Sequence, residues 1–153
     1  MEVYVDGSCC GNGKFPNKAG YGVIAFENEK VVFVYSHQEE NSTNNRQEMK
    51  AILCALIRYG KLEETVDVFS DSAYAVNSFT IWSKNWKSNG WVKSDNKPPE
   101  NLDLIKAYDK LVEEGYRINL QKVRGHSENK KNNLVDKLAT GKIAKKEIYE
   151  KYG

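Results

Sequence analysis

Four acidic residues stand where their carboxylates could act together. Asp6 follows a short stretch of alternating apolar residues, and Asp71 follows a second apolar stretch. Glu48 and Asp136 each lie near the start of an amphipathic segment. Carboxylates a few ångströms apart repel one another and raise one another's pKa values, so a cluster of them makes sense mainly around a cation. Oxygen ligands select Mg²⁺ or Mn²⁺, and two such ions about 4 Å apart form a phosphoryl-transfer site.

Each acid also has an ordinary structural interpretation. Asp6 begins an Asp-Gly dipeptide, which is common in turns. Glu48, three residues after Asn45, fits a capping box. Asp71 could belong to a turn or cap a helix, and Asp136 could simply interact favourably with the dipole of its helix. Because three of the four are expected at one edge of a sheet, coincidence is the weaker explanation.

The predicted elements explain how these acids could meet. Period-two patterns and short apolar runs predict strands over residues 2–5, 20–26, 31–36, 65–70 and 118–123. Helical spacing predicts a helix from Thr43 or Asn45 to Gly60, short helices over 73–79 and 81–87, a helix closed by Gly115, and a last helix from Asn132 or Asn133 to Gly141, followed by a charged tail. This order favours a mixed α/β sheet with helices on its faces. If strands one and four are parallel neighbours, Asp6 and Asp71 end both strands at the same edge.

Composition limits the class of protein. The chain has 153 residues, of which 40% are hydrophobic and 29% charged, and this predicts one globular domain over residues 1–153. The strongest apolar run, residues 31–35, is too short to cross a membrane, and no targeting segment is expected at the N-terminus. Three cysteines with no zinc-like spacing indicate a reducing, cytoplasmic setting.

A basic, tryptophan-rich segment occupies residues 82–97. It contains four lysines against one acid, and all three tryptophans of the chain: Lys84, Lys87, Lys93, Lys97, Asp95, Trp82, Trp86 and Trp91. Such a segment can be a solvated face over a small satellite core. Basic residues over an aromatic base are also typical of surfaces that bind a nucleic-acid backbone.

The motifs together resemble type 1 ribonuclease H over most of the chain, from Val3 to Ala139. The matching segments, in order, are DGSCCGNG, GYGVI, TNNRQEM, FSDSAY, WSKNWKSNGW, KPPENLDL and VRGHSENKKNNLVDKLA. The resemblance implies a five-stranded mixed sheet of order 3-2-1-4-5, with strands one to three antiparallel and helices on both faces. It also implies hydrolysis of the RNA strand of RNA–DNA hybrids, leaving 5′-phosphate and 3′-hydroxyl ends.

The resemblance further implies roles for individual residues. The metal-binding carboxylates are Asp6, Glu48, Asp71 and Asp136, which would hold two Mg²⁺ ions, with Mn²⁺ as a substitute. His126 is a supporting catalytic residue, suited by its near-neutral pKa to moving protons. The expected substrate contacts are Asn12 and Asn45 on the RNA strand, Thr43 and Asn85 on a DNA phosphate, and Lys84, Trp86, Lys87 and Lys93 in the basic segment. Gly7 and Ser8 are read as small residues that let a phosphate backbone approach.

Three positions depart from the family pattern or match it less clearly. Asn41 stands where many relatives have an arginine, and Ala73 stands where some have a glutamine. Asn132 is aligned with an asparagine found in relatives, less securely than the acids. A non-catalytic nucleic-acid-binding module and an integrase-type DNA phosphoryl transferase remain alternative functions. No obligate protein partner is evident, and a monomer is expected.

Overall fold

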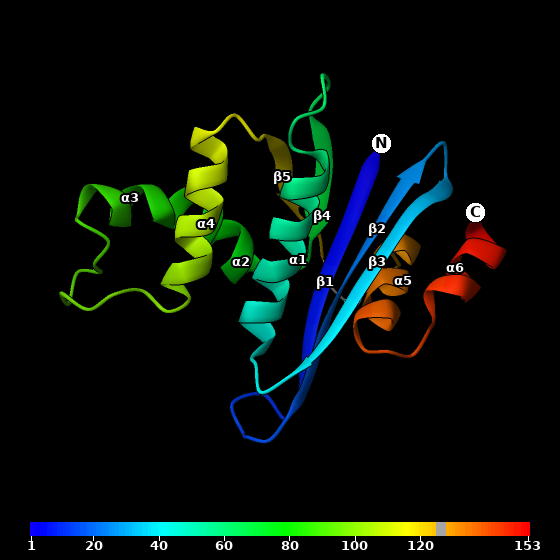
Figure 1. Ribbon diagram of the computed structural model, residues 1–153, viewed down its shortest axis with the longest axis horizontal. Helices are drawn as coiled ribbons and strands as arrows, with labels where there is room; N and C mark the ends of the chain where they lie inside the picture. Colours follow the sequence, from blue (N-terminus) through cyan, green and yellow to red (C-terminus); the bar gives the residue numbers. More distant parts are fainter. Residues whose placement is uncertain (125–127) are drawn as a thin grey trace.

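A five-stranded mixed sheet forms the centre of the protein. In the computed structural model, which describes residues 1–124 and 128–153, the strand order is β3-β2-β1-β4-β5, as the sequence predicts (Figure 1). The strands are β1 (Glu2–Cys10), β2 (Lys18–Glu27), β3 (Lys30–Glu40), β4 (Val66–Ser70) and β5 (Ile118–Lys122). The first three pair antiparallel, whereas β4 is parallel to both β1 and β5.

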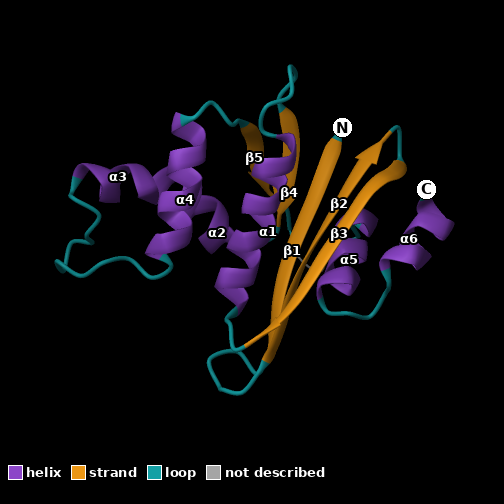
Figure 2. Cartoon of the chain, viewed as in Figure 1, coloured by secondary structure: helices purple, strands orange, loops and turns teal. Residues whose placement is uncertain are grey.

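Helices cover both faces of this sheet (Figure 2). They are α1 (Asn44–Tyr59), α2 (Ala73–Asn77), the π-helical turn η1 (Ser78–Trp82), α3 (Ser83–Ser88), α4 (Leu102–Glu113), α5 (Lys130–Ala139) and α6 (Lys145–Tyr152). Alternation along β1 divides the core between the two faces. Val3 and Val5 pack with α1 and α4, whereas Tyr4 packs on the other side with α5 and α6.

The first strand is longer than the sequence predicts. It continues through Asp6 to Cys10, which pairs with Lys18 of β2, so the Asp-Gly dipeptide lies inside a strand and forms no turn. Pairing with β2 outweighs the weak strand propensity of these residues. The parallel pairing of β1 with β4, in contrast, stops at Tyr4 and Phe69. Asp6 therefore lies just beyond the point where the two parallel strands separate.

One helix start matches one of two predicted caps, and the other differs from the prediction. Thr43 caps α1, accepting a hydrogen bond from the Arg46 N–H at 3.2 Å, so Glu48 lies in the second turn and forms no capping box with Asn45. Asn129 caps α5 in the same way, which starts that helix two residues early and places Asp136 in its second turn. Both acids thus lie in the second turn of their helices, on the side that faces the sheet.

The expected charged tail is a helix that protects the sheet edge. Within α6, Ile148 is fully buried, and the Tyr149 hydroxyl accepts a hydrogen bond from the Val34 N–H at 3.0 Å. Val34 belongs to the edge strand β3, so this contact satisfies a backbone donor that an open edge would expose. None of the helices in the described ranges is long and apolar enough to cross a membrane.

Candidate active site

Three of the four predicted acids converge where β1 and β4 separate. Asp6, Glu48 and Asp71 each offer a carboxylate oxygen, and these oxygens lie within 4.8 Å of one another. Asp136 lines the same pocket, of about 220 Å³, and makes hydrogen-bonding contact with Asp6. Residues from β1, α1, α5 and the end of β4 therefore build one acidic pocket, in agreement with the sequence.

A glycine allows α1 to approach β1 closely enough to deliver Glu48. A Cβ atom at Gly7 would lie only 2.3 Å from the backbone carbon of Gln47 and from the backbone nitrogen of Glu48. The Gly7 N–H also donates a hydrogen bond to Glu48 Oε1 at 2.5 Å. Gly7 was expected to make room for a phosphate backbone, and the structure gives it a second reason to be small.

A second glycine does the same on the opposite face. Gly22 of β2 pairs directly with Asp6, and a Cβ atom there would lie 2.9 Å from the Leu138 side chain of α5. Close packing of α5 on β2 brings Asp136, two residues before Leu138, toward Asp6. The two glycines set the depth at which both helices lie on the sheet, and hence the spacing of the acids.

Burial and mutual repulsion oppose ionisation of this cluster. Asp6 is 3% exposed, and burial raises its pKa far above the ordinary range, with further increases from its contact with Glu48 and from the charges of Glu48 and Asp71. Burial also raises the pKa of Glu48, although contact with Asp6 and the Gly7 N–H partly offsets the increase. A divalent cation would reverse this balance by favouring the charged carboxylates.

The pocket fits a hard cation. Two side-chain oxygens in it, Glu48 Oε2 and Asn132 Oδ1, are buried and have no hydrogen-bond partner among the residues that the structure describes. A buried acceptor with no donor carries a desolvation cost that a cation or its bound water would remove. The side chains lining the pocket are carboxylates and asparagine amides, the oxygen-rich set that Mg²⁺ and Mn²⁺ prefer.

Comparison with known proteins identifies the family. A family model described as RNase H matches residues 1–144. The chain belongs to the ribonuclease H family. It is 43% identical to a ribonuclease H of Caldanaerobacter subterraneus subsp. tengcongensis over 95% of this chain and 92% of that one. As a member of this family the protein is a nuclease, which hydrolyses phosphodiester bonds.

Solved structures of ribonucleases H share the fold. The solution structure of the PFV RNase H domain matches with a TM-score of 0.77 and 29% identity, covering 92% of each chain. LC11-RNase H1, solved in complex with an RNA/DNA hybrid, matches with a TM-score of 0.65 over 92% of this chain and 94% of that one. At 23% identity, the second likeness concerns the fold alone.

The residues predicted to contact the RNA strand, Asn12 and Asn45, lie next to Asn44 of α1, and of these three Asn44 alone lines the acidic pocket of this ribonuclease H. Asn12 Oδ1 accepts a hydrogen bond from the Asn44 N–H at 2.9 Å, which joins the β1–β2 loop to the start of α1. Thr43 serves as the α1 cap, and Asn45 is half-buried in the first turn. Asn44, which the sequence analysis did not select, lines the pocket and accepts a hydrogen bond from the Cys9 N–H at 2.6 Å. Its position within the TNNR motif was the available signal.

The basic segment projects away from the sheet, and its lysines differ in their surroundings (Figure 1). Lys87 binds Asp109 at 2.9 Å and also pairs with Glu113, both on α4. Lys93 lies 3.9 Å from Asp95. Lys84 is exposed on α3, and within the described residues no carboxylate lies within ion-pairing distance of it. The segment is therefore less positive than its sequence suggests.

The remaining predicted positions differ in burial and in contacts. Asn85 is exposed on α3, and Trp86 is half-buried against the main core, tilted 52° to Trp82 at a centroid distance of 6.0 Å. Asn41 uses its side chain to accept the Asn17 N–H, which anchors the β1–β2 loop. Ala73 is exposed in the first turn of α2. His126 lies outside the described residues.

Proposed function

We propose that this ribonuclease H is an endonuclease that hydrolyses the RNA strand of RNA–DNA hybrids, using two Mg²⁺ ions for which Mn²⁺ can substitute. The products would be 5′-phosphate and 3′-hydroxyl ends. The observation that carries the proposal is the convergence of Asp6, Glu48 and Asp71 within 4.8 Å, with Asp136 in the same pocket. The hybrid as substrate is supported by the family membership.

The four carboxylates would hold the ions, and the chain around them keeps each acid in place. When bound, the ions would activate the attacking water and stabilise the leaving oxygen. The Gly7 N–H fixes one oxygen of Glu48 and leaves the other free toward the pocket. Asp71 directly follows β4 and is half-buried, so it is more open to solvent than Asp6.

The proposal also covers the substrate contacts, the oligomeric state and the cellular compartment. Asn12, Asn45 and Glu48 would contact the RNA strand, where donors and acceptors can read the 2′-hydroxyl. Thr43 and Asn85 would hold a DNA phosphate, the basic segment would lie against the hybrid, and His126 would assist proton movement or product release. We also propose a monomeric single domain over residues 1–153, acting in the cytoplasm with its three cysteines reduced.

A cleavage assay with three duplexes tests this function. Labelled RNA–DNA hybrid, duplex DNA and duplex RNA are incubated with the protein in Mg²⁺, in Mn²⁺ and in excess chelator. We expect cleavage of the hybrid alone, in the RNA strand, with metal present and lost on chelation. Cleavage that survives the chelator, or no cleavage of hybrid with either metal, would overturn the proposal. Binding without cleavage would favour a non-catalytic module, and cutting of duplex DNA an integrase-type transferase.

A further inference from the structure

Positive charge is concentrated at the C-terminal end of the chain. Residues 130–153 contain seven lysines and three acids, a local net charge of +4 in a chain whose total is +2. The rest of the chain is therefore slightly acidic, despite the lysines of the basic segment. These residues include α5 and α6, which cover the face of the sheet opposite α1.

Within the described residues, five of these seven lysines have no acidic partner, and three of the five, Lys130, Lys137 and Lys142, lie on α5 or directly after it. Lys131 is held by two acids at 2.6 and 2.9 Å, and Lys146 pairs with an acid on its own helix at 3.9 Å. Lys130, Lys137 and Lys142 are exposed, and in the ranges that the structure describes no carboxylate lies within 4.0 Å of their ammonium groups. We call these three residues the α5 lysine strip.

The strip follows the rim of the acidic pocket. Asn133 and Asp136 of α5 line the pocket, and Asn133 is also exposed. Lys130 precedes Asn133 by three residues and Lys137 follows it by four, so all three share one side of the helix. Lys142 follows the end of α5, where its N–H donates a hydrogen bond to the Lys137 carbonyl at 2.8 Å. The uncompensated lysines therefore lie beside the carboxylates on the same element.

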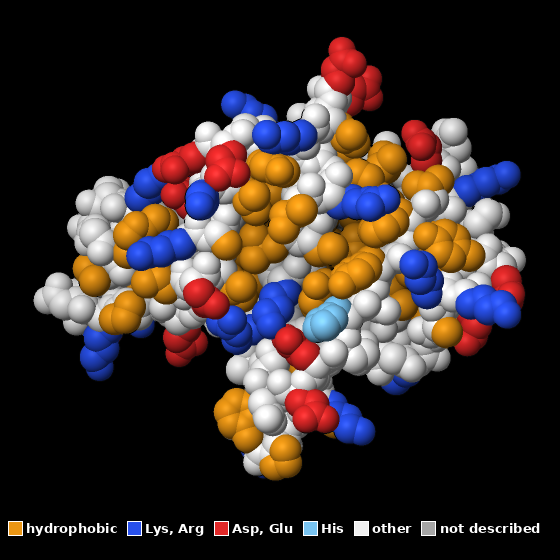
Figure 3. Space-filling model, in the orientation of Figure 1, with side chains coloured by type: hydrophobic (Ala, Val, Ile, Leu, Met, Phe, Trp, Pro, Cys, Tyr) orange, Lys and Arg blue, Asp and Glu red, His pale blue; other side chains and the backbone are white. Residues whose placement is uncertain are grey.

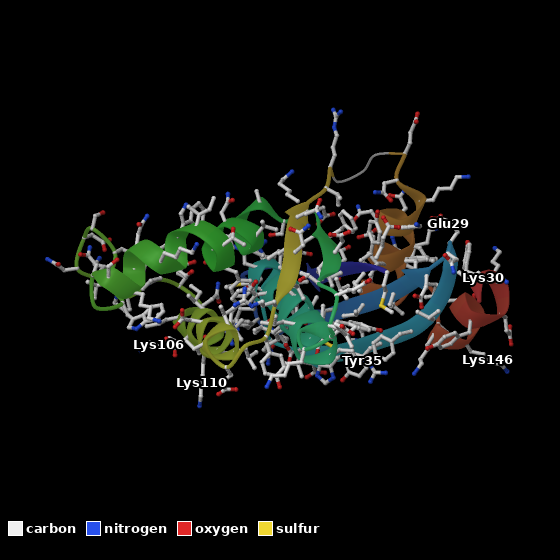
Figure 4. The ribbon with its side chains drawn as sticks, turned by 90° about the horizontal axis from the view of Figure 1, so that it is seen from above. Glu29, Lys30, Tyr35, Lys106, Lys110 and Lys146 are labelled. Atoms are coloured by element: carbon white, nitrogen blue, oxygen red, sulfur yellow. The ribbon has the colours of Figure 1, made fainter. Side chains whose placement is uncertain are left out.

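The strip and the basic segment lie on opposite sides of the site. Figures 1 and 4 both place α3 and α5 to either side of β4, whose end carries Asp71. Figure 4 also shows Lys110 on the far side of the molecule from α5. A duplex bound over the acidic pocket and extending away from α3 would next meet α5.

We infer that the α5 lysine strip is a second backbone-binding surface, which holds the phosphates of the hybrid on the side of the cut site away from the basic segment. This inference rests on the proposed function. Lys130 and Lys137 are separated by about 10 Å along the helix, at about 1.5 Å per residue. With one phosphate per about 3.4 Å of axis in each strand, the strip matches about three phosphate steps. Flexible ammonium groups at this spacing bind a backbone without reading its sequence.

The strip is tested by binding measurements that vary salt. Lys130, Lys137 and Lys142 are changed together to Gln in an Asp71→Asn background, which keeps Mg²⁺ present without cleavage. Affinity for a chimeric duplex with one short ribonucleotide block is measured by fluorescence anisotropy at several salt concentrations. Because each lost phosphate contact lowers the slope of log affinity against log salt by about 0.9, the slope should fall by about 2 to 3.

Two trimmed duplexes locate the effect. Each lacks the DNA flank on one side of the ribonucleotide block. With the duplex that lacks the flank held by the strip, the triple variant should bind as well as its Asp71→Asn background, because the phosphates that the strip holds are gone. With the duplex that keeps this flank, the triple variant should still bind more weakly than its background. An equal defect with both duplexes would show a general effect of charge and overturn the inference.

The matched control changes Lys30, Lys110 and Lys146 to Gln, which removes the same charge from exposed positions away from the pocket. Its salt slope should stay close to that of the background. A slope that falls as far in the control as in the strip variant, or an unchanged slope in the strip variant, would overturn the inference. Failure of the inference can be told from failure of the proposed function, because the proposed function is judged by cleavage of the hybrid by the unmodified chain with metal and with chelator.

Discussion

The backbone N–H of Gly7 and the carboxylate of Glu48 join strand β1 to helix α1 at the acidic pocket, with 2.5 Å between nitrogen and Oε1. The contact exists because Gly7 has no side chain. Any Cβ atom at this position would lie 2.3 Å from two backbone atoms of α1. A single glycine thus determines both how close the helix lies and where one of the metal-binding carboxylates is held.

Gly7→Ala should therefore damage the fold and the site together. Backbone atoms cannot move aside like a flexible side chain, so α1 would have to shift, at a cost of about 1–3 kcal/mol or more in the free energy of unfolding. Urea denaturation measures that cost, and the cleavage assay should show loss of activity. Ser8→Ala is the control, since its hydroxyl makes only a 3.4 Å contact with the Ala139 carbonyl. Equal stability of Gly7→Ala and the unmodified chain would contradict the packing argument.

Asp6→Asn should separate activity from stability. The substitution replaces a buried acid, whose ionisation the folded state opposes, by a neutral side chain of nearly the same shape. Hybrid cleavage should be abolished, whereas the melting temperature without metal at pH 8 should rise. Glu64→Gln, which removes one negative charge from an exposed position between α1 and β4, serves as a control for net charge. A variant that keeps near wild-type turnover would show that the carboxylate of Asp6 is not required.

Stability without metal should fall as pH rises. The pKa of Glu48 is raised to about 7 by burial, and that of Asp6 is raised further, so folding favours their protonated forms. Their contribution is complete below the unfolded values near pH 4 and is lost as pH increases through the folded values. Between about pH 4 and pH 7 the melting temperature should therefore fall as pH rises. For a chain of this size, each kcal/mol lost from the free energy of unfolding lowers the melting temperature by about 2–4 °C.

Mg²⁺ should reverse this trend. Cation binding to the ionised carboxylates stabilises the folded state by mass action, and more strongly at pH 8 than at pH 5. Thermal melts at the two pH values, with Mg²⁺ and with chelator, give the comparison. Glu39 is a useful contrast, because Lys50 and Gln47 outweigh the effect of burial and lower its pKa, so that its contribution has the opposite pH dependence. A metal-induced shift that is equal at both pH values would contradict the proposed site.

The residue patterns predicted a mixed sheet and the meeting of the acids, and the family resemblance implied the strand order, but neither gave every position from which the acids project. Asp71 follows β4 as expected, because a short apolar run ends clearly before it. Asp6 was expected to end its strand, yet β1 continues for four residues, since its pairing with β2 is a long-range contact that local turn propensity does not reveal. Helix caps at Thr43 and Asn129 likewise depend on which of several neighbouring polar residues the fold selects.

Charge partners were the least predictable part of the site. Lys87 was predicted to contact the substrate, but α4, more than twenty residues away in the sequence, supplies two acids to it. Asn44 was overlooked because its neighbours offered the expected cap and RNA contact. Its side chain accepts a hydrogen bond from the Cys9 N–H, a contact between residues far apart in the sequence that local patterns do not reveal.

Asn44→Ala should loosen the β1–β2 loop next to the pocket. The Cys9 N–H would lose its acceptor at 2.6 Å, a change of about 1 kcal/mol in the free energy of unfolding. KM for the hybrid should rise more than kcat falls, because the loop carries Asn12, a proposed contact to the RNA strand. Glu63→Ala, in an exposed position between α1 and β4, is the comparison. A fall in kcat with unchanged KM would instead assign Asn44 to the chemistry of the acidic pocket.

Lys84→Gln should weaken hybrid binding more than Lys87→Gln does. Lys84 is exposed without an acidic partner in the described residues, whereas Lys87 shares its charge with Asp109 and Glu113. A phosphate that approached Lys87 would have to compete with two carboxylates, so removing this lysine costs less affinity. The slope of log affinity against log salt should fall by about 0.9 for Lys84→Gln and by less for Lys87→Gln. If Lys87→Gln has the larger effect, the hybrid must displace the α4 acids on binding, and Asp109→Asn should then tighten binding.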